Sequence, residues 1–418
     1  MTRNISKILI GRTRRYLADY LPMMDAWRQK FFPILFKGMI QAGGLQVTKI
    51  ARCIREGDED IDTVWQRVRR HVGSREWSKS WGDVQAKFAR KNATGLHEMS
   101  PVAVDFSDLS KPYARDMEYL APVRDADLSS RLGMPIINPG YTIFESYAAL
   151  GEHGDPLPLV CFPFSVEDPA FRGQNGAMKI GMERLAAALD GMGIVIEDRG
   201  FDSNFFYNLM QELKMRFLCR LVGNRTVLDE DRKSLGLAEA VADRLPATHE
   251  APVRIWHDHR WERRDFRLGW RRIMLPDTDQ TCTLLVATRA DNPDSRIMLI
   301  TNTPVLSVVD AARLVRLYFL RWRAEDAIRI LKSELGIETV RVADFASISR
   351  LVELTFWVVS LLTLVTVELT DEQRDAINSE IAAIPTPILL FHYRVTALFR
   401  LCLLKHAPDF LSPHRAAG

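Results

Sequence analysis

The sequence predicts a mixed α/β fold, and three observations lead to this expectation. Short apolar runs broken by glycine and proline, typical of strands, alternate with longer runs whose apolar residues recur at helical spacing. In the middle of the chain the order is three strands, helix, strand, helix, strand, which indicates an antiparallel meander followed by parallel crossovers. The 418 residues, 47% hydrophobic and 26% charged, suffice for two or three globular domains.

The first segment, residues 1–98, is predicted to be a helical DNA-binding domain. Apolar residues recur at helical spacing from Tyr16 to about Met39, and shorter helices are expected at 45–55 and 62–72. Residues 1–100 carry 19 Lys and Arg against 10 Asp and Glu, a formal charge of +9, which leaves −6 for the rest. A basic domain joined to a more acidic body is typical of nucleic-acid binding. Ordinary solvated helices would have the same composition.

One face of the helix expected at 62–72 carries Arg67, Arg70 and His71. These positions are three and four residues apart, so they are neighbours on the helix surface. Arg67 and Arg70 are therefore candidate DNA contacts. A surface helix with no partner would show the same pattern.

The remaining segments follow from changes in the apolar pattern. Strands are expected at 102–104, 141–144, 157–164, 194–196 and 216–222, and helices at 178–189 and 204–213. We divide this part of the chain into the first part of a catalytic core at 99–222, a β-rich insertion at 223–304, the second part of the core at 305–370 and a helical C-terminal tail at 371–418.

Neither a membrane nor an oxidising compartment is expected. The longest uncharged apolar run, Leu354 to Val367, has 14 residues, whereas a membrane span needs roughly 20. This run is predicted to form a buried core helix. The N-terminus lacks the apolar stretch and cleavage site of a signal peptide. Five scattered cysteines without a C-x-x-C pair favour a reducing cytoplasm over a zinc site or a disulfide framework.

A long helix is expected from Asp310 to Leu335, and four of its side chains share one face. Tyr318, Arg321, Glu325 and Lys332 fall within an arc of about 60° at 100° per residue. The carboxylate could hold a metal, while the phenol, guanidinium and ammonium could bind a phosphodiester backbone. Ion pairs on a solvated helix would explain any two of these residues more easily than all four.

Two aspartates follow apolar strands, Asp105 after 102–104 and Asp198 after 194–197. If the strands are neighbours, both side chains lie at one edge of the sheet, where the helix that carries Glu325 could cross. Three carboxylates could then bind two Mg²⁺ ions, which polarise a scissile phosphate and activate the attacking oxygen. An aspartate at a strand end is more often a turn or cap residue.

Together these residues resemble the DDE transposases of prokaryotic insertion sequences. The subgroup marked by Tyr-x2-Arg-x3-Glu-x6-Lys, insertion-sequence family four, is matched at positions 318, 321, 325 and 332. The stretches Val104-Asp-Phe-Ser107 and Asp198-Arg-Gly-Phe-Asp202 resemble its two aspartate motifs. The resemblance implies a ribonuclease H-like core interrupted by a β-rich insertion, in which Asp105, Asp198 and Glu325 are catalytic and bind Mg²⁺, with two ions expected and Mn²⁺ able to substitute.

The resemblance also implies partners and reactions. Such a protein binds the terminal inverted repeats of its element, cuts DNA to free a 3′-hydroxyl and joins that end to target DNA, as a homodimer in the synaptic complex. We expect it in the cytoplasm, associated with the nucleoid, with DNA contacts from Tyr318, Arg321, Lys332 and Arg199. Nearby carboxylates are assigned to turns, caps or support of the site: Asp108, Glu197, Asp202 and Asp326.

The predicted insertion contains a basic aromatic stretch. Residues 254–272 hold seven Arg and four aromatic residues against three acids, which suits a nucleic-acid surface with Arg263, Arg264 and Trp261 as contacts. An amphipathic hairpin whose tryptophans are core is an equal alternative. The neighbouring sequence 257–259, His-Asp-His, is expected to be solvent-exposed and not a metal site.

Two other functions fit the same residues. One is a transposase-derived DNA-binding protein that no longer cuts, and the other is a ribonuclease H-like nuclease without strand transfer. Family members that cut through a DNA hairpin are expected to place an aromatic residue on the last strand of the insertion, and residues 296–301 contain none.

Overall fold

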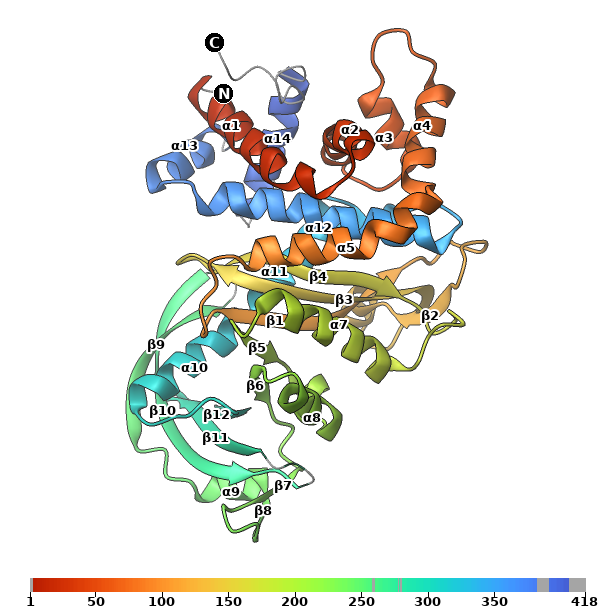
Figure 1. The fold of residues 1–418 in the computed structure, drawn as a ribbon. Coiled ribbons are helices and arrows are strands. Elements are labelled where there is room, and N and C mark those ends of the chain that lie inside the picture. The colour runs from red at the N-terminus through yellow and green to blue at the C-terminus, as the bar shows by residue number, and fades with distance from the viewer. Residues whose placement is uncertain (1–2, 258–259, 277, 279, 382–390, 406–418) are drawn as a thin grey trace.

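The structure is a computed structural model that describes residues 3–257, 260–276, 278, 280–381 and 391–405. Its helices surround a large mixed sheet (Figure 1). The helices are α1 (Arg3–Tyr20), α2 (Ala26–Ala42), α3 (Val47–Ile54), α4 (Ile61–Gly73), α5 (Arg75–Ala93), α6 (Ala126–Leu132), α7 (Gln174–Leu189), α8 (Asn204–Glu212), α9 (Ala238–Arg244), α10 (Val308–Leu320), α11 (Trp322–Ser333), α12 (Phe345–Val367), α13 (Asp371–Ile381) and α14 (Phe391–Lys405), with 3-10 helices η1 (Leu21–Met23), η2 (Arg199–Phe201) and η3 (Ile337–Thr339).

The strands of the described residues form one sheet in the order β2-β3-β1-β5-β6-β12-β11-β10-β7-β8, with β4 added beside β3 and β9 beside β10. Their bounds are β1 (Pro101–Ser110), β2 (Ala121–Arg124), β3 (Ile137–Leu150), β4 (Asp155–Phe164), β5 (Ile194–Glu197), β6 (Arg216–Arg220), β7 (Thr226–Leu228), β8 (Ser234–Leu237), β9 (His249–His257), β10 (Arg260–Met274), β11 (Thr281–Arg289) and β12 (Asn292–Thr301).

The mixed α/β fold and the predicted strand order are confirmed. Strand β3 pairs antiparallel with both β1 and β4, which makes the expected meander. Strand β5 then lies parallel to β1 and β6, and α7 and α8 make the crossovers. A parallel connection needs such a crossover because the chain must return to the same end of the sheet.

The side chains of β1 and β5 point alternately to the two faces of the sheet, and a separate apolar core covers each face. Val102 and Val104 belong to the apolar cluster that contains α7 and α8. Ala103 faces the cluster built from α11 and α12, and Ile194 and Ile196 face the cluster that contains α10. Successive side chains of a strand point to opposite faces, so this assignment fixes where the following polar residues point.

The segment predicted to be β-rich, 223–304, contains β7 to β12 together with α9. It continues the same sheet, because β12 pairs with β6 over Leu299–Thr301. Figure 1 shows these strands curving away below β5 and β6, with α10 packed on their inner side.

Helices α1 to α5 fill the predicted N-terminal segment and share one core with the C-terminal helices. The indole of Trp357 on α12 stacks on the ring of Phe88 of α5, with ring centroids 4.3 Å apart. It also meets the ring of Phe32 of α2 edge-on, with centroids 5.2 Å apart. The hydroxyl of Tyr16 on α1 donates to the backbone carbonyl of Trp357 at 3.0 Å. The N-terminal helices are therefore anchored on α12, as Figure 1 shows.

Helix α12 contains the apolar run that was predicted to be a core helix. Its 23 residues are long and apolar enough to cross a membrane by length and composition alone. However, 89% of its most apolar window is buried inside the protein. Helix α12 packs between the N-terminal helices and β4, which accounts for its apolar surface on all sides.

Several expectations about element boundaries were wrong. The helix expected from Tyr16 to about Met39 is divided between α1 and α2, because η1 follows Tyr20 and Asp25 caps a new helix. Strand β1 does not end before Asp105 but runs to Ser110, because β3 pairs with it as far as Gly140. The helix expected from Asp310 to Leu335 is two helices that meet at Arg321. There the amide of Arg321 bonds the carbonyl of Tyr318 three residues back, and the carbonyl of Arg321 accepts from Ala324. Pairing with β3 therefore extends β1 beyond its apolar residues, and the tight turn at Arg321 divides a helix that the apolar spacing had predicted to be continuous.

A buried carboxyl group on α12 gives the fold a pH dependence. Burial raises the pKa of Glu353 to about 7, although Trp81 and Gln85 of α5 donate hydrogen bonds to it. Between about pH 4.5 and pH 7 the unfolded chain releases a proton that the folded chain retains, so the free energy of unfolding falls as pH rises.

We predict that Glu353→Gln removes this dependence, because a neutral amide has no proton to lose. Relative to wild type, the variant should gain on the order of 3 kcal/mol in unfolding free energy between about pH 5 and about pH 8. Urea unfolding of both proteins at the two pH values measures this difference. The half-exposed Glu183→Gln on α7 is the control and should parallel wild type. Parallel pH profiles for Glu353→Gln and wild type would contradict the prediction.

Candidate active site

The register of two parallel strands brings the two predicted aspartates together. The β1–β5 pairing ends at Ala103 opposite Ile196. Two residues further along each strand are Asp105 and Asp198. Side chains two residues apart point to the same face, so both carboxylates lie on the α10 and α11 side, where β5 ends and leaves β1 open. The structure therefore places the two aspartates next to each other, as the sequence suggested.

The guanidinium of Arg321 lies between the three predicted carboxylates. Its nitrogen atoms are 3.7 Å from Oδ2 of Asp105, 3.6 Å from Oδ2 of Asp198 and 3.3 Å from Oε1 of Glu325. The Arg321 side chain is only 9% exposed, whereas the carboxylates are 37%, 43% and 50% exposed. The hydroxyl of Tyr318 donates to Oδ1 of Asp198 at 3.3 Å. One buried cation thus holds three carboxylates that remain open to solvent.

The junction between α10 and α11 explains this geometry. Tyr318 lies in the last turn of α10, Arg321 forms the junction, and Glu325 lies in the first turn of α11. The apolar residues of α10 pack on the inner face of β9 to β12, while those of α11 pack against α12. Each helix is anchored separately, which aims the polar side chains at the end of β5 and the adjoining middle of β1.

Two fully buried glutamates flank Asp105. Glu145 is opposite Asp105 on β3 and accepts a hydrogen bond from the hydroxyl of Tyr147 at 2.8 Å. Glu197 lies just before Asp198, on the opposite face of β5, and both of its oxygens lack a hydrogen-bond partner among the described residues. The sequence analysis assigned Glu197 to a turn, a cap or support of the site, and it missed Glu145, which no motif marks in β3.

The electrostatics of the cluster follow from burial and from Arg321. Burial raises the pKa of Asp105 and of Glu325, although the positive charge of Arg321 opposes both shifts. For Asp198 burial acts in the same direction, but Arg321 and the amide of Arg199 outweigh it, so its pKa is lowered. Burial also raises the pKa of Glu197 well above its usual range and that of Glu145 to about 8.

The three carboxylates suit a divalent cation by their chemistry. Carboxylate oxygens are the ligands that Mg²⁺ prefers, and all three already face one shared positive charge. In the part of the chain that the structure describes, however, no three His, Cys, Asp or Glu side chains are close enough to hold a metal. Coordination would require Asp105, Asp198 and Glu325 to turn from Arg321 towards the ion.

Lys332 does not join this group, although the sequence placed it on the same helical arc. Its ammonium lies 3.1 Å from Asp108, 3.2 Å from Asp127 and 3.3 Å from Glu338. Burial lowers its pKa, but these three carboxylates outweigh burial and raise it. Lys332 links the second half of β1 to α6 and η3, beside the three-carboxylate cluster.

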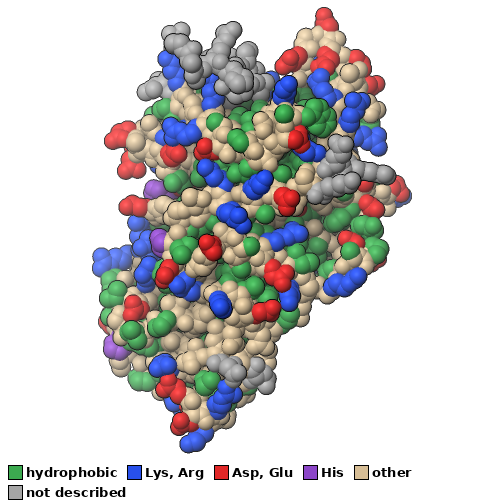
Figure 2. Space-filling model, in the orientation of Figure 1, with side chains coloured by type: hydrophobic (Ala, Val, Ile, Leu, Met, Phe, Trp, Pro, Cys, Tyr) green, Lys and Arg blue, Asp and Glu red, His purple; other side chains and the backbone are tan. Residues whose placement is uncertain are grey.

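The other predicted DNA contacts are distributed over the molecule. Arg199 is exposed on η2 directly after Asp198, and Arg70 is exposed on α4. Arg67 makes a two-point ion pair with Glu59 at 2.6 and 3.1 Å. Lys, Arg, Asp and Glu are interspersed on the face in Figure 2, without one continuous basic surface.

The basic aromatic stretch of the insertion is partly structural. Trp261 is half-buried, with the guanidiniums of Arg254 and Arg316 over its ring at 4.7 and 5.9 Å. Arg264 pairs with Glu262, whereas Arg263 is exposed. Asp258 and His259 lie outside the described residues. The stretch thus combines tryptophans that are partly buried against the core with some exposed arginines, and a nucleic-acid contact of these arginines stays a prediction.

A second buried ion pair was missed by the sequence analysis. Arg323 pairs with Asp326 and, at 3.2 Å, with Asp155 of β4, and all three side chains are buried. Its Nε donates to the carbonyl of Gly154 at 2.9 Å. Asp326 is therefore a structural partner that fixes α11 to β4, next to Glu325. No local signal marks it, because Asp155 lies 168 residues before Arg323.

Comparison with known families supplies the deciding observation. Residues 174–361 match the family described as Transposase DDE domain. This segment, less than half of the chain, is similar to a transposase DDE domain. The match includes Asp198, the insertion and the α10–α11 junction with Glu325, and it begins after Asp105.

Comparisons with curated proteins and with solved structures do not extend this family match. No curated protein matches the chain significantly. A solved structure, the synaptic complex of piggyBac transposase with hairpin DNA, aligns with 99% of this chain and 86% of that chain at 10% identity and a TM-score of 0.41.

We predict that Arg321→Gln destabilises the protein in a way that Mg²⁺ reverses. Without the guanidinium, the three carboxylates repel one another, at a cost on the order of 1–2 kcal/mol once solvent screening is considered. A divalent cation would replace the lost charge, so the melting temperature of Arg321→Gln should rise more with added Mg²⁺ than that of wild type.

Thermal unfolding with EDTA and with increasing Mg²⁺ measures this response. The matched control is Arg313→Gln, an exposed arginine on α10. Equal Mg²⁺ responses of Arg321→Gln and wild type would show that the carboxylates do not form a cation site.

Proposed function

We propose that this protein is a DNA transposase of an insertion sequence, of the Tyr-x2-Arg-x3-Glu-x6-Lys subgroup, with Asp105, Asp198 and Glu325 as catalytic carboxylates. The observation that carries the proposal is the convergence of these side chains on Arg321 where β5 ends beside the middle of β1. The three side chains come from three different elements and remain partly exposed around one buried guanidinium, which leaves their oxygens accessible to a ligand. The transposase DDE domain around Asp198 and Glu325 supports the same reading.

The proposed chemistry is cleavage of a DNA strand and transfer of its 3′ end to target DNA. Two divalent cations, Mg²⁺ or Mn²⁺, would polarise the scissile phosphate and stabilise the attacking and leaving oxygens. Asp105, Asp198 and Glu325 would hold them. Burial raises the pKa of Glu145 and of Glu197, which favours their uncharged forms and limits the negative charge beside Asp105 and Asp198.

Cationic side chains around the carboxylates would position the DNA strand. Arg321 and Tyr318 lie closest to the carboxylates, and Arg199 is exposed directly after Asp198. The ammonium of Lys332 on α11 contacts Asp108, three residues beyond Asp105 on β1. A guanidinium matches two phosphate oxygens at once, which fixes the orientation of the strand. We assign Tyr318, Arg321, Lys332 and Arg199 to the phosphates next to the cut.

The rest of the proposal concerns the assembly. The meander with its parallel strands would be a ribonuclease H-like core interrupted by residues 223–304, and residues 1–98 would bind the terminal inverted repeats. The exposed arginines of β10 and of α4 would add contacts to DNA. We place the protein in the cytoplasm with the nucleoid, as a homodimer when two element ends are paired.

We predict that Glu325→Gln abolishes cleavage and leaves DNA binding nearly unchanged, because the amide removes a metal ligand but no phosphate contact. Asp105→Asn and Asp198→Asn should behave alike. Cleavage and joining of DNA that carries the element's ends, with Mg²⁺, measure the first effect, and electrophoretic mobility shift measures the second.

Glu183→Gln, which changes an exposed carboxylate on α7, should cleave normally. Cleavage near the wild-type rate by Glu325→Gln would refute the triad. A wild-type protein that binds the ends without cutting would instead indicate a DNA-binding protein derived from a transposase, and cutting without joining would indicate a nuclease.

We predict that Lys332→Ala lowers the cleavage rate by on the order of a hundredfold, because a misplaced strand reacts slowly. Lys332→Arg should restore most of the rate, since it retains the positive charge between Asp108 and Glu338. Single-turnover cleavage and the melting temperature of both variants should be measured together. A large loss of stability in Lys332→Ala with an unchanged rate would make Lys332 purely structural.

A further inference from the structure

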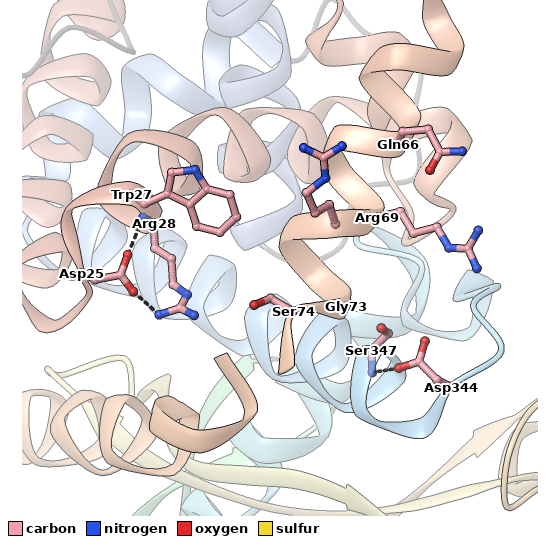
Figure 3. A pocket seen from close by; sticks show the side chains of 10 residues that line it. Asp25, Trp27, Arg28, Gln66, Arg69, Gly73, Ser74, Asp344 and Ser347 are labelled. Atoms are coloured by element: carbon pink, nitrogen blue, oxygen red, sulfur yellow. Dashed lines mark hydrogen bonds and ion pairs between the residues drawn. The ribbon is translucent and has the colours of Figure 1, made fainter. Parts of the chain in front are cut away.

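The N-terminal helices form a pocket that the site described above does not use. It has a volume of about 720 Å³ and opens between α2, α4 and the start of α12. Trp27 and Arg28 come from α2, Gln66 and Arg69 from α4, and Asp344 and Ser347 from the start of α12 (Figure 3). Pockets of this size accommodate a small organic ligand or a nucleotide.

One wall of the pocket is a preformed aromatic stack. The imidazole of His71 on α4 lies between Trp27 and Phe31 of α2, with ring centroids 3.7 and 3.6 Å away and interplanar angles of 16° and 11°. His71 and Phe31 are buried, but Trp27 remains 48% exposed. Burial and nearby arginines lower the pKa of His71 to about 4, so the stack is uncharged at neutral pH. The stack presents a rigid indole to the pocket.

The opposite wall supplies positive charge. Arg69 and Arg70 are both exposed on α4, and neither forms an ion pair among the side chains that the structure describes. The acids of the pocket are engaged elsewhere. Asp25 caps α2 and pairs with Arg28, and Asp344 caps α12 by accepting from the amide of Ser347 at 2.8 Å. The pocket therefore combines an exposed aromatic ring with two guanidiniums that no described carboxylate neutralises, and that of Arg69 lies over the Trp65 ring, 5.3 Å from its centroid.

We propose that this pocket binds one unpaired base of a DNA strand, stacked on Trp27, with the adjoining phosphate held by Arg69 and Arg70. The inference rests on the proposed DNA-binding function and adds a preference for unpaired DNA. A base can stack on an indole only when its own face is free, which excludes the paired bases of a duplex. A free phosphate would not need the exposed indole, and an apolar peptide would not need two guanidiniums.

The test uses the full chain in EDTA, so that binding is measured without cleavage. Fluorescence anisotropy compares a labelled duplex that carries a short single-stranded overhang with the same duplex made blunt. Wild type should prefer the overhang. Trp27→Ala should lose on the order of tenfold in affinity for the overhang duplex and change little for the blunt one, because stacking contributes about 1–3 kcal/mol per base.

Three variants complete the design. Trp27→Phe should keep most of the preference, since it retains an aromatic face. The double variant Arg69→Ala with Arg70→Ala should weaken binding of both duplexes and reduce its salt dependence. Arg131→Ala, which removes an exposed arginine from α6, is the control for charge loss and should bind as wild type does. Circular dichroism and melting temperature check that each variant is folded.

The outcomes separate this inference from the proposed function. If wild type binds both duplexes equally, or if Trp27→Ala weakens both by the same factor, the pocket does not hold an unpaired base. If deoxyadenosine monophosphate competes as well as the overhang strand, the pocket is a mononucleotide site and the inference is overturned. Absence of binding to either duplex at low salt refutes the DNA-binding function together with the inference.

Discussion

The guanidinium of Arg321 holds three carboxylates from three different elements together. The pairing of β1 with β5 in the central sheet places two of these carboxylates within its reach. Asp105 and Asp198 would repel each other where β5 ends beside the middle of β1, and Glu325 would add to that repulsion. One buried cation offsets all three charges while the carboxylates remain accessible. A site of this kind is stable without a ligand, yet each of its acids can still reach one.

The surroundings of the cluster control charge by burial. Glu145 and Glu197 are next to the cluster in sequence or register, but they are fully buried, and burial raises the pKa of both, which favours their uncharged forms. Arg323 is paired with Asp326 and Asp155 and fixes the start of α11. The carboxylates around Arg321 are thus partly exposed and can reach a ligand, whereas the buried pairs of Arg323 only fix the position of α11.

Helix α12 connects the N-terminal helices, which are proposed to bind DNA, with the central sheet that carries the carboxylate cluster. It packs on β4 on one side and receives α1, α2 and α5 around Trp357 on the other. The pocket beside Trp27 includes the N-terminal cap of α12, whereas the carboxylate cluster lies where α10 and α11 meet the sheet. Because the N-terminal helices share a core with the central sheet, DNA held by these helices would have a defined position relative to the proposed site.

The sequence by itself determined the mixed α/β order, the core helix around Trp357 and the three carboxylates, because strand alternation, helical spacing and motif spacing are local. Tertiary structure alone decided three other features. Pairing with β3 extended β1 past Asp105, the separate packing of α10 and α11 placed Arg321 at a junction, and chain folding brought Asp108, Asp127 and Glu338 to Lys332. These contacts join residues far apart in the chain, and their energies depend on burial and pairing, which no local pattern encodes.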